Sequence, residues 1–64
     1  MRTPLLLTVE EAARELGIGR SRMFELIGSG AVDSVKVGRS RRIPTAALGE
    51  YVDRLRVEQR QEVA

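Results

Sequence analysis

The basic side chains in the middle of this 64-residue chain are the groups whose types and spacing could do chemistry. Two of them, Arg20 and Arg22, fall at the start of an expected helix, and four more lie within seven residues further on. Those four are Lys36, Arg39, Arg41 and Arg42. With six basic and two acidic residues, the segment 20–42 carries a formal charge of +4, whereas the whole chain carries +2. Clustered cations of this kind are suited to binding phosphates.

The rest of the composition excludes most catalytic chemistry. The chain contains no cysteine and no histidine, so a disulfide, a thiolate nucleophile, a zinc finger and a Ser-His-Asp triad are all excluded. The adjacent Glu10 and Glu11 diverge on a helix and fit first-turn and capping roles better than acid–base catalysis. The glycine spacing matches no phosphate-binding loop. We therefore expect no enzymatic activity, no cofactor, no metal and no small-molecule substrate.

The longest uninterrupted apolar run, Leu5-Leu6-Leu7, is far shorter than a membrane span or the core of a signal peptide. We therefore expect a soluble, intracellular protein that does not associate with membranes. An apolar content of 42% argues against wholesale disorder.

Two short helices are predicted in the first half of the chain. Thr8 followed three residues later by Glu11 forms a capping-box pattern, and Gly17 is suited to end the helix that follows, at residues 9–16. A second apolar stripe then predicts a helix at residues 20–28, which begins after Gly19. Two helices joined by a short turn that contains glycine form a helix-turn-helix unit.

The second half of the chain changes its periodicity. Val35 and Val37 alternate with polar residues, which predicts a short β-hairpin with Arg39-Ser40 at its tip and a return strand that stops at Pro44. Thr45 is then a predicted N-cap.

The third predicted helix occupies residues 46–57 and has an apolar stripe of its own. We expect a single domain over residues 1–57 and a frayed or disordered tail over residues 58–64.

The placement of the cations suggests an anionic partner. Arg20 and Arg22 oppose the macrodipole at the start of their helix, and a bound phosphate would relieve that conflict. The four hairpin cations would repel one another unless something negative faced them. The alternatives are that the two arginines extend into solvent and that the hairpin is a solvated basic edge, which discourages aggregation.

Three other residues complete the outward face of the second helix: Ser21, Phe24 and Glu25. Phe24 lies off the apolar stripe and either borders the core or contacts a sugar or a thymine methyl. Glu25 either forms an i, i+3 ion pair with Arg22, which we favour, or accepts a hydrogen bond from cytosine N4.

The strings LLTVEEAARELGIGRSRMFELIGSG and VKVGRSRRIPTAALGEYV resemble the excisionase-type, MerR-like winged helix-turn-helix family over residues 6 to about 55. The resemblance implies a mainly α fold with a small β-hairpin, in which the second helix enters the major groove of DNA and the hairpin, or wing, contacts the adjacent minor groove or backbone. It implies that the helix contributes Arg20, Ser21, Arg22, Phe24 and Glu25, and that the wing contributes Lys36, Gly38, Arg39, Ser40, Arg41 and Arg42. This chain departs from the family at Gly19, where Ser or Thr is usual, and at Phe24, where Tyr is common.

The same resemblance implies a bacterial, DNA-associated protein of the cytoplasm, from a phage or an integrative element. Excisionases of this kind bind and bend attachment-site DNA without cutting it and direct an integrase towards excision, often with further copies on adjacent sites. The expected partners are therefore double-stranded DNA, an integrase and other copies of the chain. Two alternatives remain, a small MerR-like transcriptional regulator and, less favoured, a protein-interaction module such as an antitoxin.

Overall fold

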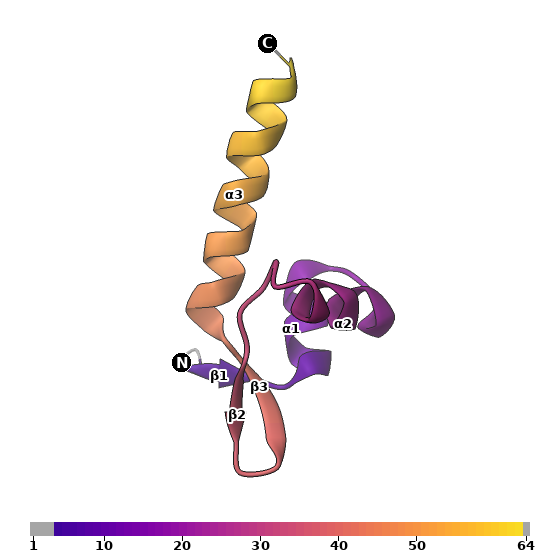
Figure 1. Cartoon of the computed structure of the whole chain (residues 1–64), viewed down its shortest axis with the longest axis vertical. Coiled ribbons are helices and arrows are strands. Elements are labelled where there is room, and N and C mark those ends of the chain that lie inside the picture. The colour runs from indigo at the N-terminus through magenta and orange to yellow at the C-terminus, as the bar shows by residue number, and fades with distance from the viewer. Residues whose placement is uncertain (1–3, 64) are drawn as a thin grey trace.

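The computed structural model describes residues 4–63, with side chains described for residues 4–60. The elements in chain order are β1 (Leu6–Leu7), α1 (Val9–Leu16), α2 (Arg20–Gly28), β2 (Val35–Val37), β3 (Ser40–Pro44) and α3 (Thr45–Val63). In Figure 1 the hairpin β2–β3 and the helix α3 extend in opposite directions from the level at which α1 and α2 lie. The expected fold class is confirmed: the chain is a winged helix-turn-helix, mostly helical with a small antiparallel sheet.

Helix α1 has the bounds that the sequence predicts, because both of its ends are set by local chemistry. The Glu11 amide donates to Thr8 Oγ1 at 3.0 Å, and the Thr8 amide donates to Glu11 Oε1 at 2.9 Å, which completes the predicted capping box. Gly17 ends the helix with φ +71°, a left-handed conformation that a side chain would strain.

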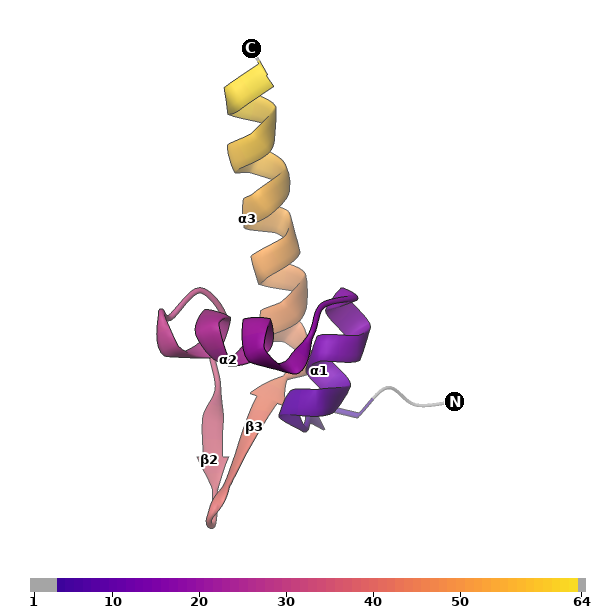
Figure 2. The ribbon, with the colours of Figure 1, turned by 90° about the vertical axis from the view of Figure 1, so that its right-hand side faces the viewer.

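Helix α2 also has its predicted bounds and packs beside α1 across a short turn (Figure 2). Gly19 is its N-cap, in an extended conformation, and makes no side-chain capping bond. Met23 and Leu26 are buried, so the opposite side of the helix remains exposed.

The sheet has the order β1-β3-β2, with both pairs antiparallel. Val37 pairs with Ser40, so the two-residue tip of the hairpin is Gly38-Arg39, and the predicted tip Arg39-Ser40 is wrong. Gly38 has φ +62°, and glycine at the first position of a two-residue loop is the pattern of the type II′ hairpin turn. The turn therefore forms where glycine permits a positive φ, one residue earlier than expected.

The sequence did not predict strand β1. Leu6 and Leu7 pair with Pro44 and Ile43, and the Thr45 amide donates to the Leu5 carbonyl at 2.9 Å. A two-residue strand has no periodicity of its own, so only its partner β3 defines it.

Helix α3 differs from the prediction at both ends. It begins at Thr45 instead of after it, and it continues to Val63, beyond the expected end at residue 57. Thr45 is therefore the first helical residue, and its hydroxyl donates to the Pro4 carbonyl. After Gly49 the chain contains no glycine or proline that would stop the helix, and the segment that was expected to fray is helical through residue 63. Residue 64 of that predicted tail lies outside the described residues, as do residues 1–3 of the predicted domain.

The core lies where the sheet, α1, α2 and the first turns of α3 meet. Its fully buried large side chains are Met23, Val32 and Ile43. Arg54 of α3 donates to the Ala31 carbonyl and so joins α3 to the loop after α2. Over residues 4–63, no helix is long and apolar enough to cross a membrane.

Substitutions of the two glycines around the turn between α1 and α2 should change the free energy of unfolding in opposite directions. Gly17→Ala should lower the free energy of unfolding by about 1 kcal/mol, because Ala is strained at positive φ. Gly19→Ser should raise it by a few tenths of a kcal/mol, because φ −76° suits serine, no atom lies within 4 Å of an added Cβ, and the hydroxyl supplies the missing cap. Urea titrations of both variants test this, and an unchanged midpoint for Gly17→Ala would contradict it.

Candidate nucleic-acid interface

The five residues of α2 that the sequence singles out all lie on its exposed face. They are Arg20, Ser21, Arg22, Phe24 and Glu25. The buried side of the same helix is occupied by Met23 and Leu26, which anchor it to the core. The helix therefore presents its first turns to solvent on a rigid support.

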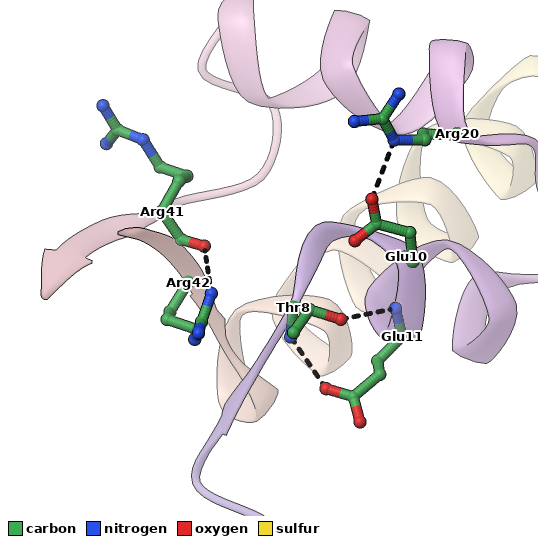
Figure 3. Close-up of polar contacts among 6 residues, drawn as sticks. All are labelled: Thr8, Glu10, Glu11, Arg20, Arg41 and Arg42. Carbon is green, nitrogen blue, oxygen red and sulfur yellow. Dashed lines mark hydrogen bonds and ion pairs between the residues drawn. The ribbon is translucent and has the colours of Figure 1, made fainter. Parts of the chain in front are cut away.

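Arg20 has two partners that hold its guanidinium. Its Nε donates to Glu10 Oε2 of α1 at 2.8 Å (Figure 3). Its Cζ lies 4.9 Å from the centroid of the Phe24 ring. The sequence assigned Glu10 only to the first turn of α1 and missed this contact. Glu10 and Arg20 are ten residues apart on two helices, so no spacing rule within one helix pairs them.

Arg22 is also paired with a carboxylate. Its Nη1 donates to Glu25 Oε1 at 2.9 Å, which confirms the favoured i, i+3 ion pair. Both arginines at the start of α2 thus have acidic neighbours. The side chains of both pairs remain more than half exposed, so water weakens the pairs and a phosphate can compete for each arginine.

The register of the hairpin divides the wing cations between its two faces. Lys36 and Arg41 are directly opposite each other and share a face with buried Ile43, which we call the inner face. Arg42 is opposite Val35 on the outer face, which also carries Val37 and Ser40. The expectation that all the wing cations point to one side is therefore wrong, because alternate residues of a strand point to opposite faces.

The wing cations have no acidic partner in the described part of the chain. Arg41 donates from Nη1 to Ser34 Oγ at 3.2 Å, and Arg42 donates from Nη1 to the Arg41 carbonyl at 3.2 Å. In Figure 3, Arg41 extends from β3 towards the side on which α2 lies. Arg39 and Gly38 form the tip of the hairpin, at its far end from the helices. The inner face and the tip thus present positive charge on the wing, and Arg41 extends towards the side on which α2 lies (Figure 3).

Exposed apolar side chains lie on α3 and on the sheet. Val57 of α3 is exposed, whereas the side chain of Val63 lies outside the described residues. Leu6, Val35 and Val37 are also exposed, and the register places all three on the outer face of the sheet. The protein thus has an apolar outer sheet face in addition to the cationic inner face. Among the described residues no cluster of three acids could hold a metal ion.

The comparisons with known proteins agree on one kind of domain. A family model described as "Helix-turn-helix domain" matches residues 6–56. A protein named "Probable excisionase" from Saccharopolyspora erythraea is 51% identical over 55 residues, which cover 86% of this chain and 56% of that protein. One named "Excisionase" from Streptomyces ambofaciens is 40% identical over 50 residues, covering 78% of this chain and 81% of that protein. The chain thus spans little more than half the length of the first relative. No solved structure matches the chain significantly.

Because of the two acidic residues at the start of α1, we expect the protein to lose stability at acidic pH. Its own backbone amide, and then the Arg20 guanidinium, hold the pKa of Glu10 below its ordinary value of 4.5. The Thr8 amide, and then the Thr8 hydroxyl, lower the pKa of Glu11 likewise. Because both pKa values are depressed by folding, the two carboxylates stabilise the fold fully above pH 4.5, and this contribution is lost as the pH falls through 4.5 and below.

The urea concentration at the midpoint of unfolding should therefore be constant near neutral pH for the wild type. It should decrease once the pH is lower than about 5. The double variant Glu10→Gln, Glu11→Gln should show a shallower fall, since neither amide titrates. Glu58→Gln, on the exposed part of α3, is the matched control and should follow the wild type. Equal falls in the double variant and the wild type would show that these two acids do not cause the loss.

Proposed function

This chain belongs to the helix-turn-helix domain family, and we propose that it is a DNA-binding excisionase. In this role it binds and bends attachment-site DNA and directs a separate integrase towards excision, without catalysing strand cleavage itself. The relatives named excisionase support the excision role, and the arrangement of charge beside α2 supports DNA as the ligand.

The observation that carries the proposal is the direct pairing of Lys36 with Arg41 on the inner face of the wing. Like charges directly opposite each other on a sheet destabilise it, and the described residues place no carboxylate beside either cation. A phosphate of DNA would accept from both side chains and turn this repulsion into attraction. A hairpin that needed only to be a stable edge would gain from an acid at one of the two positions.

The exposed face of α2 suits the major groove. The N-terminal residues of a recognition helix reach base edges while flanking elements contact the phosphates and set the register on the duplex. Here Arg20, Ser21 and Arg22 occupy that N-terminal turn, and the wing extends from the level of the two helices to its cationic tip (Figure 2). We assign base contacts to α2 and phosphate contacts to Lys36, Arg39 and Arg41, whereas Arg42 contributes to the overall field from the outer face.

Helix α3 offers the surface for a protein partner. It extends from the domain in the direction opposite to the wing, so a wing bound to DNA leaves the far part of α3 accessible (Figure 1). Residues 50–62 include both acidic and basic residues, and Val57 among them is exposed. We propose this segment as the contact with the integrase.

A small transcriptional regulator is the second candidate, because it needs the same groove contacts and phosphate contacts. The two functions differ in the DNA site that they use and in the recombination reaction. Binding at attachment sites with stimulation of excision supports an excisionase, whereas binding confined to promoter DNA supports a regulator.

Footprinting and excision assays test the proposal on the attachment-site DNA of the element that encodes the chain, with the integrase of that element. We expect a footprint on the attachment-site DNA and more excision product. Resonance energy transfer between fluorophores at the two ends of the duplex should increase as the duplex bends. Three to five phosphate contacts predict that log K falls against log salt with a slope of about −2.7 to −4.5. Binding that does not depend on salt would overturn the proposal of a DNA-binding protein.

Lys36→Glu should stabilise the protein and weaken its binding to DNA. The substitution replaces a like-charge pair with an ion pair, which should raise the free energy of unfolding by about 0.2–1 kcal/mol. It also removes a phosphate contact, so binding to all duplexes should weaken and the magnitude of the salt slope should fall by about one unit. Thermal melts and fluorescence anisotropy measure the two effects.

Arg60→Glu makes the same change of charge near the far end of α3 and is the matched control, which should leave DNA binding almost unchanged. If Lys36→Glu were stabilising but bound DNA as the wild type does, the wing would be only a solvated basic edge.

A further inference from the structure

Arg20 is held by contacts that come from two different helices. Glu10 of α1 accepts from its Nε at 2.8 Å, and the Cζ of Arg20 lies 4.9 Å from the centroid of the Phe24 ring, one helical turn further along α2. One contact holds the guanidinium through Nε and the other restrains its face. Together they reduce the rotamer freedom of a side chain that is otherwise exposed.

These contacts do little for folding. The side chains of Arg20 and Glu10 are 65% and 53% exposed, and water screens ion pairs of that kind. Phe24 is 44% exposed, although the chain has only two aromatic residues and a small core that could use them. A role on the exposed face explains why these groups lie there.

The contacts leave accessible the edge of the Arg20 guanidinium that carries Nη1 and Nη2. A guanidinium has five N–H donors, and Glu10 takes the one on Nε. Within the part of the chain that the structure describes, Nη1 and Nη2 have no hydrogen-bond partner. Two parallel donors on one edge match the O6 and N7 acceptors that guanine presents in the major groove.

Arg22 makes the contrast clear. Its Nη1 donates to Glu25 at 2.9 Å, so its terminal edge is already in use and must leave Glu25 before it can read a base. Arg20 needs no such rearrangement, and a side chain that is restrained before binding loses less entropy on binding.

We propose that Glu10 and Phe24 are positioning residues that hold Arg20 ready to read a guanine, and that the target site contains a G·C pair opposite the start of α2. This inference rests on the proposed binding of DNA by α2. It makes an acid on the first helix, which also stabilises the start of that helix, a determinant of sequence specificity.

The experiment uses the full chain and a library of duplexes with a randomised central segment, sequenced after selection at one fixed salt concentration. We expect the wild type to enrich a motif with a strongly preferred G·C pair, and Arg20→Ala to lose that preference by about 5- to 150-fold, the range of one bidentate contact. Glu10→Ala and Phe24→Leu should lose part of the same preference, by a smaller factor than Arg20→Ala, because Arg20 remains but is no longer held.

Conservative variants separate positioning from charge and from stability. Glu10→Gln keeps an oxygen for Nε and Phe24→Tyr keeps the ring, so both should retain the wild-type preference to within about twofold. In the Arg20→Ala background, Glu10→Ala should change the preference no further, whereas a purely structural effect of Glu10 would persist there. Replacing the preferred guanine with 7-deazaguanine, which lacks N7, should weaken the wild type and leave Arg20→Ala unaffected.

The outcomes distinguish this inference from the function on which it rests. If the wild type enriched no motif, specific DNA binding itself would fail. If a motif appeared but Arg20→Ala kept it, or if Glu10→Ala only tightened binding to all duplexes equally, the positioning role would be overturned and the proposed function would stand.

Discussion

Burial of Ile43 is the constraint on which the rest of the structure depends. It lies on β3, the central strand, which pairs with β1 and β2 and packs against α1 and α3. In a chain of 64 residues the core is so small that one wholly buried β-branched side chain ties the wing to the helices. Because side chains alternate along a strand, the inward direction of Ile43 sets the direction of every neighbour, and a slip of one residue would reverse them. The same constraint therefore places Arg41 on the inner face and Arg42 on the outer face.

Two kinds of cation result from this arrangement. The arginines of α2 have carboxylate partners on α1 and α2, whereas Lys36 and Arg41 face each other across the hairpin with no acid beside them. Paired arginines contribute less net attraction to phosphate but have defined positions, which suits recognition of bases. The wing cations are less fixed by neighbouring side chains but carry more net charge, which suits contacts with the phosphate backbone of DNA. Specificity and affinity are thus assigned to different elements of one small domain.

The length of α3 gives the molecule its elongated shape, with extents of 44 × 29 × 18 Å. Its first turns complete the core through Ala47 and Leu48, and the remainder extends into solvent. An exposed helix that makes few contacts with its own domain has surface to offer another protein, and it lies on the side away from the wing. In the proposed function, DNA and a protein partner would therefore be bound on opposite sides of the molecule.

The elements that the sequence predicted with correct bounds are those whose ends depend on neighbouring residues. The Thr8–Glu11 capping box and Gly17 define α1 within a few residues, and the apolar stripe of α2 follows from its own periodicity. The strand β1 and the Glu10–Arg20 contact were decided only by tertiary structure. Each of these depends on how two separate segments pack, since the register of β3 and the angle between α1 and α2 are set by burial in the common core. The sequence thus determined which residues are charged and which local elements carry them. The fold decided which of those charges meet a carboxylate and which stay open to a partner, because distances between distant segments follow from packing and not from spacing along the chain.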